Sequence, residues 1–164
     1  MRTIKSHVRN YKTIPKIKKQ TILIDDEDYE WVSAVKWYTT SGYAKSYEFR
    51  MHRLIMNAPP DMEVDHINGN GLDNRRANLR LCTKSQNQAN CKTQIGTSKY
   101  KGVCWHDMGK KWLAYIVKDY KTIYLGLYKT EDEAGLAYNF GAKHHFGEFA
   151  KPNPITTGGY LKNG

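Results

Sequence analysis

The chain has 164 residues, enough for one ordinary domain or two small ones, and its 26 Lys and Arg outweigh 16 Asp and Glu to give a net charge of +10. This balance favours a polyanionic partner such as nucleic acid. No apolar stretch approaches the roughly 18–20 residues of a membrane span, and no apolar signal core follows the N-terminus, so we expect a cytoplasmic protein without a membrane partner. Three cysteines without a CxxC pair argue against a structural zinc knuckle and fit a reducing compartment.

The first part of the chain is basic and then alternates between short elements. Residues 1–20 carry only basic charges, which predicts an arm that follows a phosphate backbone, although a solvated tail has the same composition. Residues 21–25 predict a strand, and the acids that open 26–37, followed by spaced apolar residues, predict a short helix. The alternation of residues 37–56 around Ser41-Gly42 predicts a hairpin.

The segment from Glu63 to Asn90 predicts the order strand, loop, strand and helix. "EVDHI" and "NLRLCT" are strand-like, whereas "NGNGLDNR" between them is dense in Gly, Asn and Asp and predicts a loop. "TKSQNQANC" predicts a helix, with Thr83 and Ser85 as candidate N-caps.

A polar linker precedes a different pattern in the last third of the chain. Three short aromatic-rich strands are predicted, with turns at Met108-Gly109 and Asp119-Tyr120. A helix follows, because Thr130 and Glu133 form a capping-box pattern and Gly147 marks an end. Its small residues and one tyrosine predict a face that packs closely on a sheet: Ala134, Ala137, Tyr138 and Ala142.

Asp65-His66 is the pair in this sequence that best suits catalysis. Asp is a hard oxygen ligand for Mg²⁺ or Mn²⁺, and His can take a proton from water near neutral pH. Phosphodiester hydrolysis needs both a base and a cation. Asn87 offers a second oxygen ligand, and Asn78 can pin the loop through its backbone. The alternative reading is a turn-rich connector without chemistry.

A resemblance favours the catalytic reading. Residues 52–90, with HRL, VDHINGN, LDNR, NLR and S-x-N at fixed spacings, resemble phage-type HNH homing endonucleases. The resemblance implies a ββα-metal finger around one divalent cation. It implies that Asp65 and Asn87 are metal ligands, that His66 is the general base and that Asn78 is the catalytic-site residue that holds the loop.

The same resemblance bears on the metal and on the basic residues around the finger. Asn87 stands where other HNH branches have histidine, which favours Mg²⁺ or Mn²⁺ over Zn²⁺. His52, in the HRL element, is expected to be a packed structural histidine. Four arginines are candidates for phosphate contacts, with solvated loop charges as the alternative: Arg53, Arg75, Arg76 and Arg80.

Residues 98–153 resemble the AP2 DNA-binding domain, through motifs such as Y-x-G-V, K-W-x-A-x-I and T-x-x-E-A. The resemblance implies that a three-stranded sheet braced by a helix enters the major groove. All seven arginines of the chain precede residue 91, so this sheet is expected to hold DNA through lysine and aromatic residues. Trp112 has a core position under the helix as its alternative. The expected DNA contacts are Lys101, Trp105, Lys111, Trp112 and Tyr124.

The predicted fold class is α+β. We expect a small N-terminal β-rich region with the HNH finger, a linker, and an AP2-like three-stranded antiparallel sheet packed on one helix. The expected boundaries are 1–20 for a basic arm, 21–91 for the nuclease domain with its finger at 63–91, 92–97 for a linker, 98–153 for the AP2-like domain and 154–164 for a tail.

The predicted function is a metal-dependent endonuclease that hydrolyses phosphodiester bonds in double-stranded DNA, by nicking or by double-strand cleavage. We expect a homing-endonuclease-like, phage-encoded protein with no small-molecule cofactor, and both a monomer and a homodimer stay open. The alternative is a DNA-binding regulatory protein with a catalytically inactive HNH finger.

Overall fold

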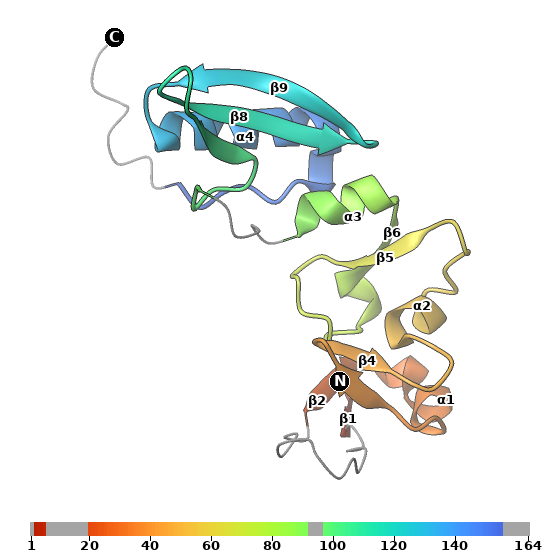
Figure 1. Cartoon of the computed structure of the whole chain (residues 1–164). Coiled ribbons are helices and arrows are strands. Elements are labelled where there is room, and N and C mark those ends of the chain that lie inside the picture. Colours follow the sequence, from red (N-terminus) through yellow and green to blue (C-terminus); the bar gives the residue numbers. More distant parts are fainter. Residues whose placement is uncertain (1, 6–19, 92–96, 156–164) are drawn as a thin grey trace. The chain divides into compact units, whose positions relative to one another are not determined.

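The computed structural model describes residues 2–5, 20–91 and 97–155 (Figure 1). Its small antiparallel sheets and its helices confirm the α+β class. The chain divides into two compact units, residues 1–87 and residues 88–164. No helix in the described part of the chain is long and apolar enough to cross a membrane.

The first unit opens with a strand that the sequence did not predict. Strand β1 (Arg2–Lys5) pairs antiparallel with the predicted strand β2 (Thr21–Ile24), with Ile4 opposite Ile22. Ile4 packs against the core, so burial of an apolar side chain stabilises this strand at the start of the expected basic arm. The rest of the expected arm, residues 6–19, lies outside the described residues.

Short elements follow β2. The predicted hairpin is confirmed, and both turn residues have positive φ, 50° at Ser41 and 80° at Gly42, as a two-residue hairpin turn requires. The predicted helix is also present but is short, whereas the prediction was wrong for residues 51–55, which the alternating pattern included in the hairpin and which form a helix. These elements are η1 (Asp26–Asp28), α1 (Tyr29–Ser33), β3 (Tyr38–Thr40), β4 (Tyr43–Lys45) and α2 (Met51–Ile55).

One apolar core holds these elements together and reaches the finger. Trp37 is fully buried, and its Nε1 donates to the carbonyl of Val32 at 2.8 Å. Met51 buries α2 in the same core, while Val64 and Leu79 bring in two strands of the finger. The finger is therefore fixed by packing against the N-terminal elements.

The finger has the predicted order of strand, loop, strand and helix. Strands β5 (Glu63–His66) and β6 (Leu79–Cys82) are antiparallel and are followed by helix α3 (Lys84–Asn90), and the loop contains η2 (Arg76–Asn78). Thr83 caps α3: its Oγ1 accepts from the Gln86 amide at 3.2 Å, and its own amide donates to Gln86 Oε1 at 2.8 Å. Of the two candidate caps, Thr83 is confirmed.

The second unit is the predicted three-stranded antiparallel sheet with one helix. The strand order is β7-β8-β9, and α4 packs against the sheet. The tight turn between β8 and β9 has positive φ at Asp119 and Tyr120, 50° and 62°. The predicted capping box of Thr130 and Glu133 is present. The elements are β7 (Val103–His106), β8 (Lys111–Lys118), β9 (Lys121–Tyr128), α4 (Glu131–Phe146) and η3 (Gly147–Phe149).

The face of α4 that packs on the sheet is the predicted one. Ala134, Tyr138 and Ala142 are buried in the second core. Gly102, just before β7, has φ +68°, and a Cβ on it would lie 2.1 Å from the Tyr138 ring. A glycine at this position lets the start of β7 approach the helix closely.

The division between the units falls inside α3. The ammonium of Lys101 donates to the carbonyls of Gln88, Ala89 and Cys91, at 2.6, 2.8 and 3.1 Å, which satisfies the C-terminal end of this helix. Burial lowers the pKa of Lys101. Most of the expected linker, residues 92–96, and the tail from residue 156 lie outside the described residues.

Candidate active site

Asp65 and Asn87 reach the same face of strand β5. Side chains two residues apart on a strand share a face, so Glu63 and Asp65 point the same way. The Asn87 Nδ2 donates to Glu63 Oε2, which places Asn87 of helix α3 on that face. Asp65 is itself held by its cross-strand partner Arg80, whose Nε and Nη2 lie 2.9 and 2.7 Å from Asp65 Oδ2. The fold therefore places the two residues predicted to hold a metal on the same face of β5.

His66 is buried and has a different set of neighbours. Its Nε2 lies 3.4 Å from Asn74 Oδ1, and its ring centroid lies 5.0 Å from that of His52 and 5.8 Å from that of Tyr43. An amide oxygen only accepts, so Nε2 carries the proton and Nδ1 keeps its lone pair. Burial lowers the pKa of His66, which keeps the imidazole neutral, as a general base requires.

His52 is packed directly beside this imidazole. It is 4% exposed, and its pKa falls to about 3, chiefly through burial and then through the neighbouring charges of His66, Arg50 and Arg53. Sequence reasoning expected a structural histidine here but missed Tyr43 and Asn74. Asn74 stands in the LDNR motif, so motif spacing could have singled it out, whereas only the fold brings the hairpin residue Tyr43 to this place.

Asn78 braces the chain immediately after His66. Its Nδ2 donates to the Asp73 carbonyl at 2.8 Å and to Asn68 Oδ1 at 3.1 Å, and its Oδ1 accepts from the Asn68 amide at 3.0 Å. Asn68 is two residues beyond His66, so these bonds fix the backbone that carries the imidazole. A side chain at Gly71 would meet the carbonyl of the hairpin turn at 2.5 Å, which shows how closely the same loop packs there.

The arginines expected to bind DNA have partners within the protein. Arg53 donates to the carbonyls of Met62 and Pro59 at 2.6 and 2.8 Å and so holds the connection between α2 and β5. The Arg75 Nε and Nη2 bond the Asp73 carboxylate, both at 2.7 Å. Arg80 pairs with Asp65, as described above.

Arg76 joins the finger to the N-terminal elements. Its Nη2 lies 2.8 Å from Asp28 and its Nε 3.0 Å from Glu27, and its backbone amide donates to Asp25 at 2.8 Å. Within the part of the chain that the structure describes, these three acids are also the group of carboxylates whose oxygens all lie within 4.8 Å of one another. Because Arg76 contacts each of them, this cluster is explained as an ion-pair network.

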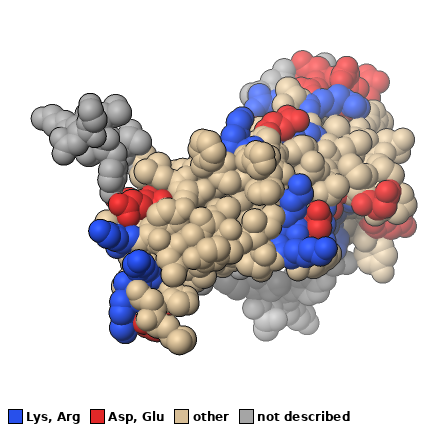
Figure 2. All heavy atoms as spheres, turned by 90° about the horizontal axis from the view of Figure 1, so that it is seen from above, with Lys and Arg blue, Asp and Glu red and all other residues tan. Residues whose placement is uncertain are grey.

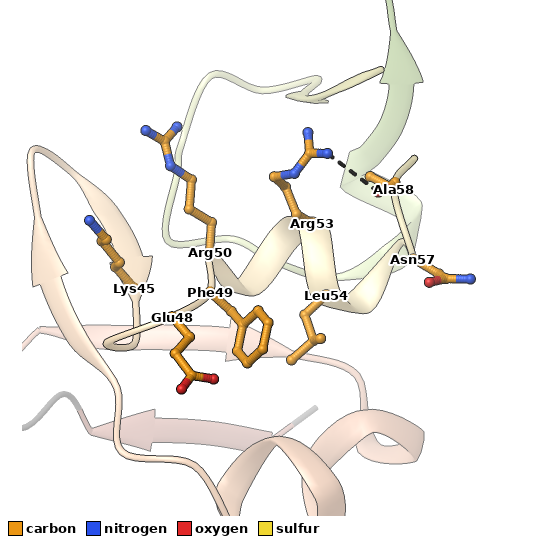
Figure 3. Close-up of a pocket in the computed structure, with 8 residues that line it drawn as sticks. All are labelled: Lys45, Glu48, Phe49, Arg50, Arg53, Leu54, Asn57 and Ala58. Atoms are coloured by element: carbon orange, nitrogen blue, oxygen red, sulfur yellow. Dashed lines mark hydrogen bonds between the residues drawn. The ribbon is translucent and has the colours of Figure 1, made fainter. Parts of the chain in front are cut away.

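A pocket of about 470 Å³ lies next to α2, and Arg53 is one of the residues that line it (Figure 3). Arg50 and Arg53 extend on one side of the helix, while Phe49 and Leu54 lie on the other (Figure 3). Cations outnumber acids in its lining, which consists of Lys45, Glu48, Phe49, Arg50, Arg53, Leu54, Asn57 and Ala58.

The residues expected to bind DNA in the second unit lie on different faces. Trp105 and Trp112 are cross-strand partners with ring centroids 5.2 Å apart, and Trp112 packs against the core, so strand alternation places both on the side that α4 covers. Lys111 points the opposite way, and Tyr124, 62% exposed, pairs with Tyr115 on the open face. Lys101 instead contacts the end of α3.

The open face of this sheet is poor in charge. Seen from the side of β8 and β9, uncharged residues form a broad area, and Lys and Arg gather toward its margins (Figure 2). Lys111, the exposed first residue of β8, lies on this face by strand alternation.

Comparisons with known proteins agree with the geometry. Residues 51–89 match the family model of the HNH endonucleases. The chain is also 40% identical over 134 residues to an uncharacterised HNH endonuclease of Acanthamoeba polyphaga mimivirus, in a match that spans 76% of this chain and 70% of that protein. The chain belongs to the HNH endonuclease family. No solved structure matches it.

This HNH endonuclease is therefore a DNA-cleaving hydrolase, and the matched segment contains Asp65, His66, Asn78 and Asn87. HNH nucleases generally use a divalent metal. The donors present fit such an ion: a carboxylate and a carboxamide oxygen are hard ligands of the kind that Mg²⁺ and Mn²⁺ prefer, and both lie on one face of β5.

Proposed function

We propose that this HNH endonuclease is a metal-dependent, homing-endonuclease-like enzyme that hydrolyses phosphodiester bonds in duplex DNA. Asp65 and Asn87 hold one Mg²⁺ or Mn²⁺, His66 is the general base, and Asn78 holds the loop that positions it. The observation that supports this most is a buried His66, with a lowered pKa, next in sequence to an aspartate whose strand face also receives Asn87.

The residues of the finger and the bound cation have different proposed roles in hydrolysis. His66 accepts a proton from the attacking water at Nδ1, because Asn74 engages Nε2 and so fixes the tautomer. A bound cation stabilises charge on the scissile phosphate and the leaving oxygen. The expected products are a 5′ phosphate and a 3′ hydroxyl. One finger cuts one strand at a time, so a monomer nicks, and a double-strand break needs a dimer or two events.

We propose that residues 98–153, within the second unit, form an AP2-like DNA-binding domain and that residues 21–91 form the nuclease domain. The three-stranded sheet with a helix on one face supports this. Lys111 and Tyr124 are its DNA contacts, because they lie on the face that α4 leaves open. Trp112, which packs against the core, and Lys101, which contacts the end of α3, support the fold instead, while the exposed Trp105 stays a candidate DNA contact. A viral origin, and action inside a host cell, are supported by the mimivirus relative.

Nicking of supercoiled plasmid tests this function. We expect conversion to open circles with Mg²⁺ or Mn²⁺, loss of nicking with EDTA, and a decrease of at least about 100-fold in His66→Ala. The exposed Phe140, on α4, supplies a matched control, since Phe140→Ala should nick normally. Nicking that survives both EDTA and His66→Ala would contradict the assignment. Tight DNA binding without nicking by any divalent ion would favour the regulatory alternative.

A further inference from the structure

We propose that Glu63 is a positioning residue of the cation site. It holds the carboxamide of Asn87 with Nδ2 turned toward the Glu63 carboxylate, so that Oδ1 is the atom left for the cation. This inference rests on the proposed function, which assigns Asn87 as a ligand.

The chemistry of an asparagine ligand makes such a partner necessary. The two ends of a carboxamide are nearly equal in size, and a half-turn of the amide exchanges them, but only the oxygen can bind a cation. A carboxylate accepts hydrogen bonds and cannot donate them. The contact between Asn87 and Glu63 Oε2 therefore selects the orientation with nitrogen toward Glu63.

Both partners are held on regular elements. Glu63 is the first residue of β5 and pairs across the sheet with buried Cys82. Asn87 lies in the first turns of α3, and its amide donates to the carbonyl of the capping residue Thr83 at 2.9 Å. A site built on a strand and a capped helix keeps its geometry better than one on loops.

The two predicted ligands are thus supported in the same manner. Asp65 is held by Arg80, from the neighbouring strand, and Asn87 is held by Glu63, from the strand that carries Asp65. Outer-sphere partners of this kind orient ligands, and their removal typically costs about 10–100-fold in metal affinity. The cationic Arg80 hydrogen-bonds the Asp65 carboxylate, and the anionic Glu63 accepts a hydrogen bond from the Asn87 amide.

A second role for Glu63 would be to attract the cation by charge alone, and an Asn87→Asp background separates the two roles. A carboxylate at position 87 binds a cation through either oxygen and needs no orientation. Glu63→Gln, which can donate as well as accept, should then weaken binding only when position 87 is asparagine. An effect of charge alone would weaken binding in both backgrounds.

The test is calorimetric titration of Mn²⁺ into the full chain. We expect the Kd to rise about 10-fold in Glu63→Gln, not to rise with the same substitution in Asn87→Asp, where it removes a like-charge contact, and to stay unchanged in the control Glu48→Gln, an exposed acid of the same unit. An unchanged Kd in Glu63→Gln, or an equal rise in both backgrounds, overturns the inference. If the unsubstituted chain and Asn87→Ala bind Mn²⁺ alike, the proposed metal site fails, and this inference fails with it.

Discussion

At the scale of single residues, burial governs the imidazole that is proposed to act as the base. His66 packs against His52 and Tyr43, and its Nε2 lies 3.4 Å from Asn74 Oδ1. Asn74 is fully buried, so its amide can hold the ring in one orientation. The pKa and the orientation of His66 thus depend on the residues packed around it.

Asn74→Leu should lower the kcat for nicking by about 10-fold while leaving the KM for DNA little changed. Leucine has a similar volume but lacks the acceptor for His66 Nε2, so the imidazole loses its fixed tautomer. Steady-state nicking assays measure both constants. Tyr43→Phe, which keeps the ring packing, is the matched control. An unchanged kcat in Asn74→Leu would show that the contact does not position the base.

The lowered pKa of His52 predicts that the protein loses stability in mild acid. Its folded pKa of about 3 lies below the unfolded value of 6.5, so the unfolded chain takes up its proton first. The free energy of unfolding should therefore fall as the pH drops from about 6.5 toward 3. The pKa of His66 is also lowered, so His66 contributes to the same loss of stability. The pKa of Asp73 is lowered by Arg75, so the stability that this ion pair contributes is lost only at more acidic pH.

Urea denaturation at several pH values measures this effect. In His52→Gln the fall between pH 6.5 and 4 should be smaller than in the unsubstituted chain, because one of the two depressed histidines is gone. Parallel curves for the two proteins would mean that His52 is not responsible for the acid sensitivity.

At the scale of elements, the sequence predicts structure well where a periodic pattern is long or a cap is explicit. The three strands of the sheet in the second unit and helix α4, capped by Thr130, are such cases. Helix α2 was missed because five residues are too few to show a helical period, and burial of Met51 and Ile55 decides its conformation. Strand β1 was missed because its basic residues obscured the pairing of Ile4 with Ile22.

Arg76→Ala should destabilise the nuclease unit by about 1–3 kcal/mol, because it leaves the buried Asp28 carboxylate without its cationic partner. The guanidinium is 45% exposed, which limits the loss. Chemical denaturation measures it, with the exposed Arg50→Ala as the control. Adding Asp28→Asn should recover part of the loss. If Arg76→Ala instead weakens DNA binding at unchanged stability, the original expectation of a phosphate contact is correct.

Thr130→Ala should destabilise the second unit by about 1 kcal/mol. The threonine Oγ1 accepts from the Glu133 amide at 3.2 Å, and Glu133 Oε2 accepts in return from the Thr130 amide at 3.1 Å. The substitution leaves one donor at the start of α4 without its side-chain partner. Thermal unfolding monitored by circular dichroism compares it with Phe140→Ala on the same helix. Equal melting temperatures for all three proteins would exclude a capping contribution.

At the scale of the whole molecule, charge indicates the kind of partner but not which residues bind it. The net charge of +10 favours DNA, yet the arginines at 53, 75, 76 and 80 each bond a carbonyl or a carboxylate of the protein. Their partners are fixed by the fold, and Asp28 lies 48 positions from Arg76. For the same reason the sequence could propose roles for Asp65, His66 and Asn87 by motif, but it did not indicate that Glu63 contacts Asn87 or that Asn74 contacts His66.

On the open face of the sheet β7-β8-β9, we expect a charge contact and an aromatic contact with DNA, and their contributions can be measured separately. Each lysine that neutralises one phosphate adds about 0.9 to the slope of log affinity against log salt. Lys111→Gln should therefore reduce that slope by about 0.9, whereas Tyr124→Ala should weaken binding without changing it. Phe140→Ala, on a different element, should alter neither quantity. Fluorescence anisotropy of a labelled duplex over a range of salt concentrations measures all three variants, and an unchanged slope in Lys111→Gln would remove this face from the DNA interface.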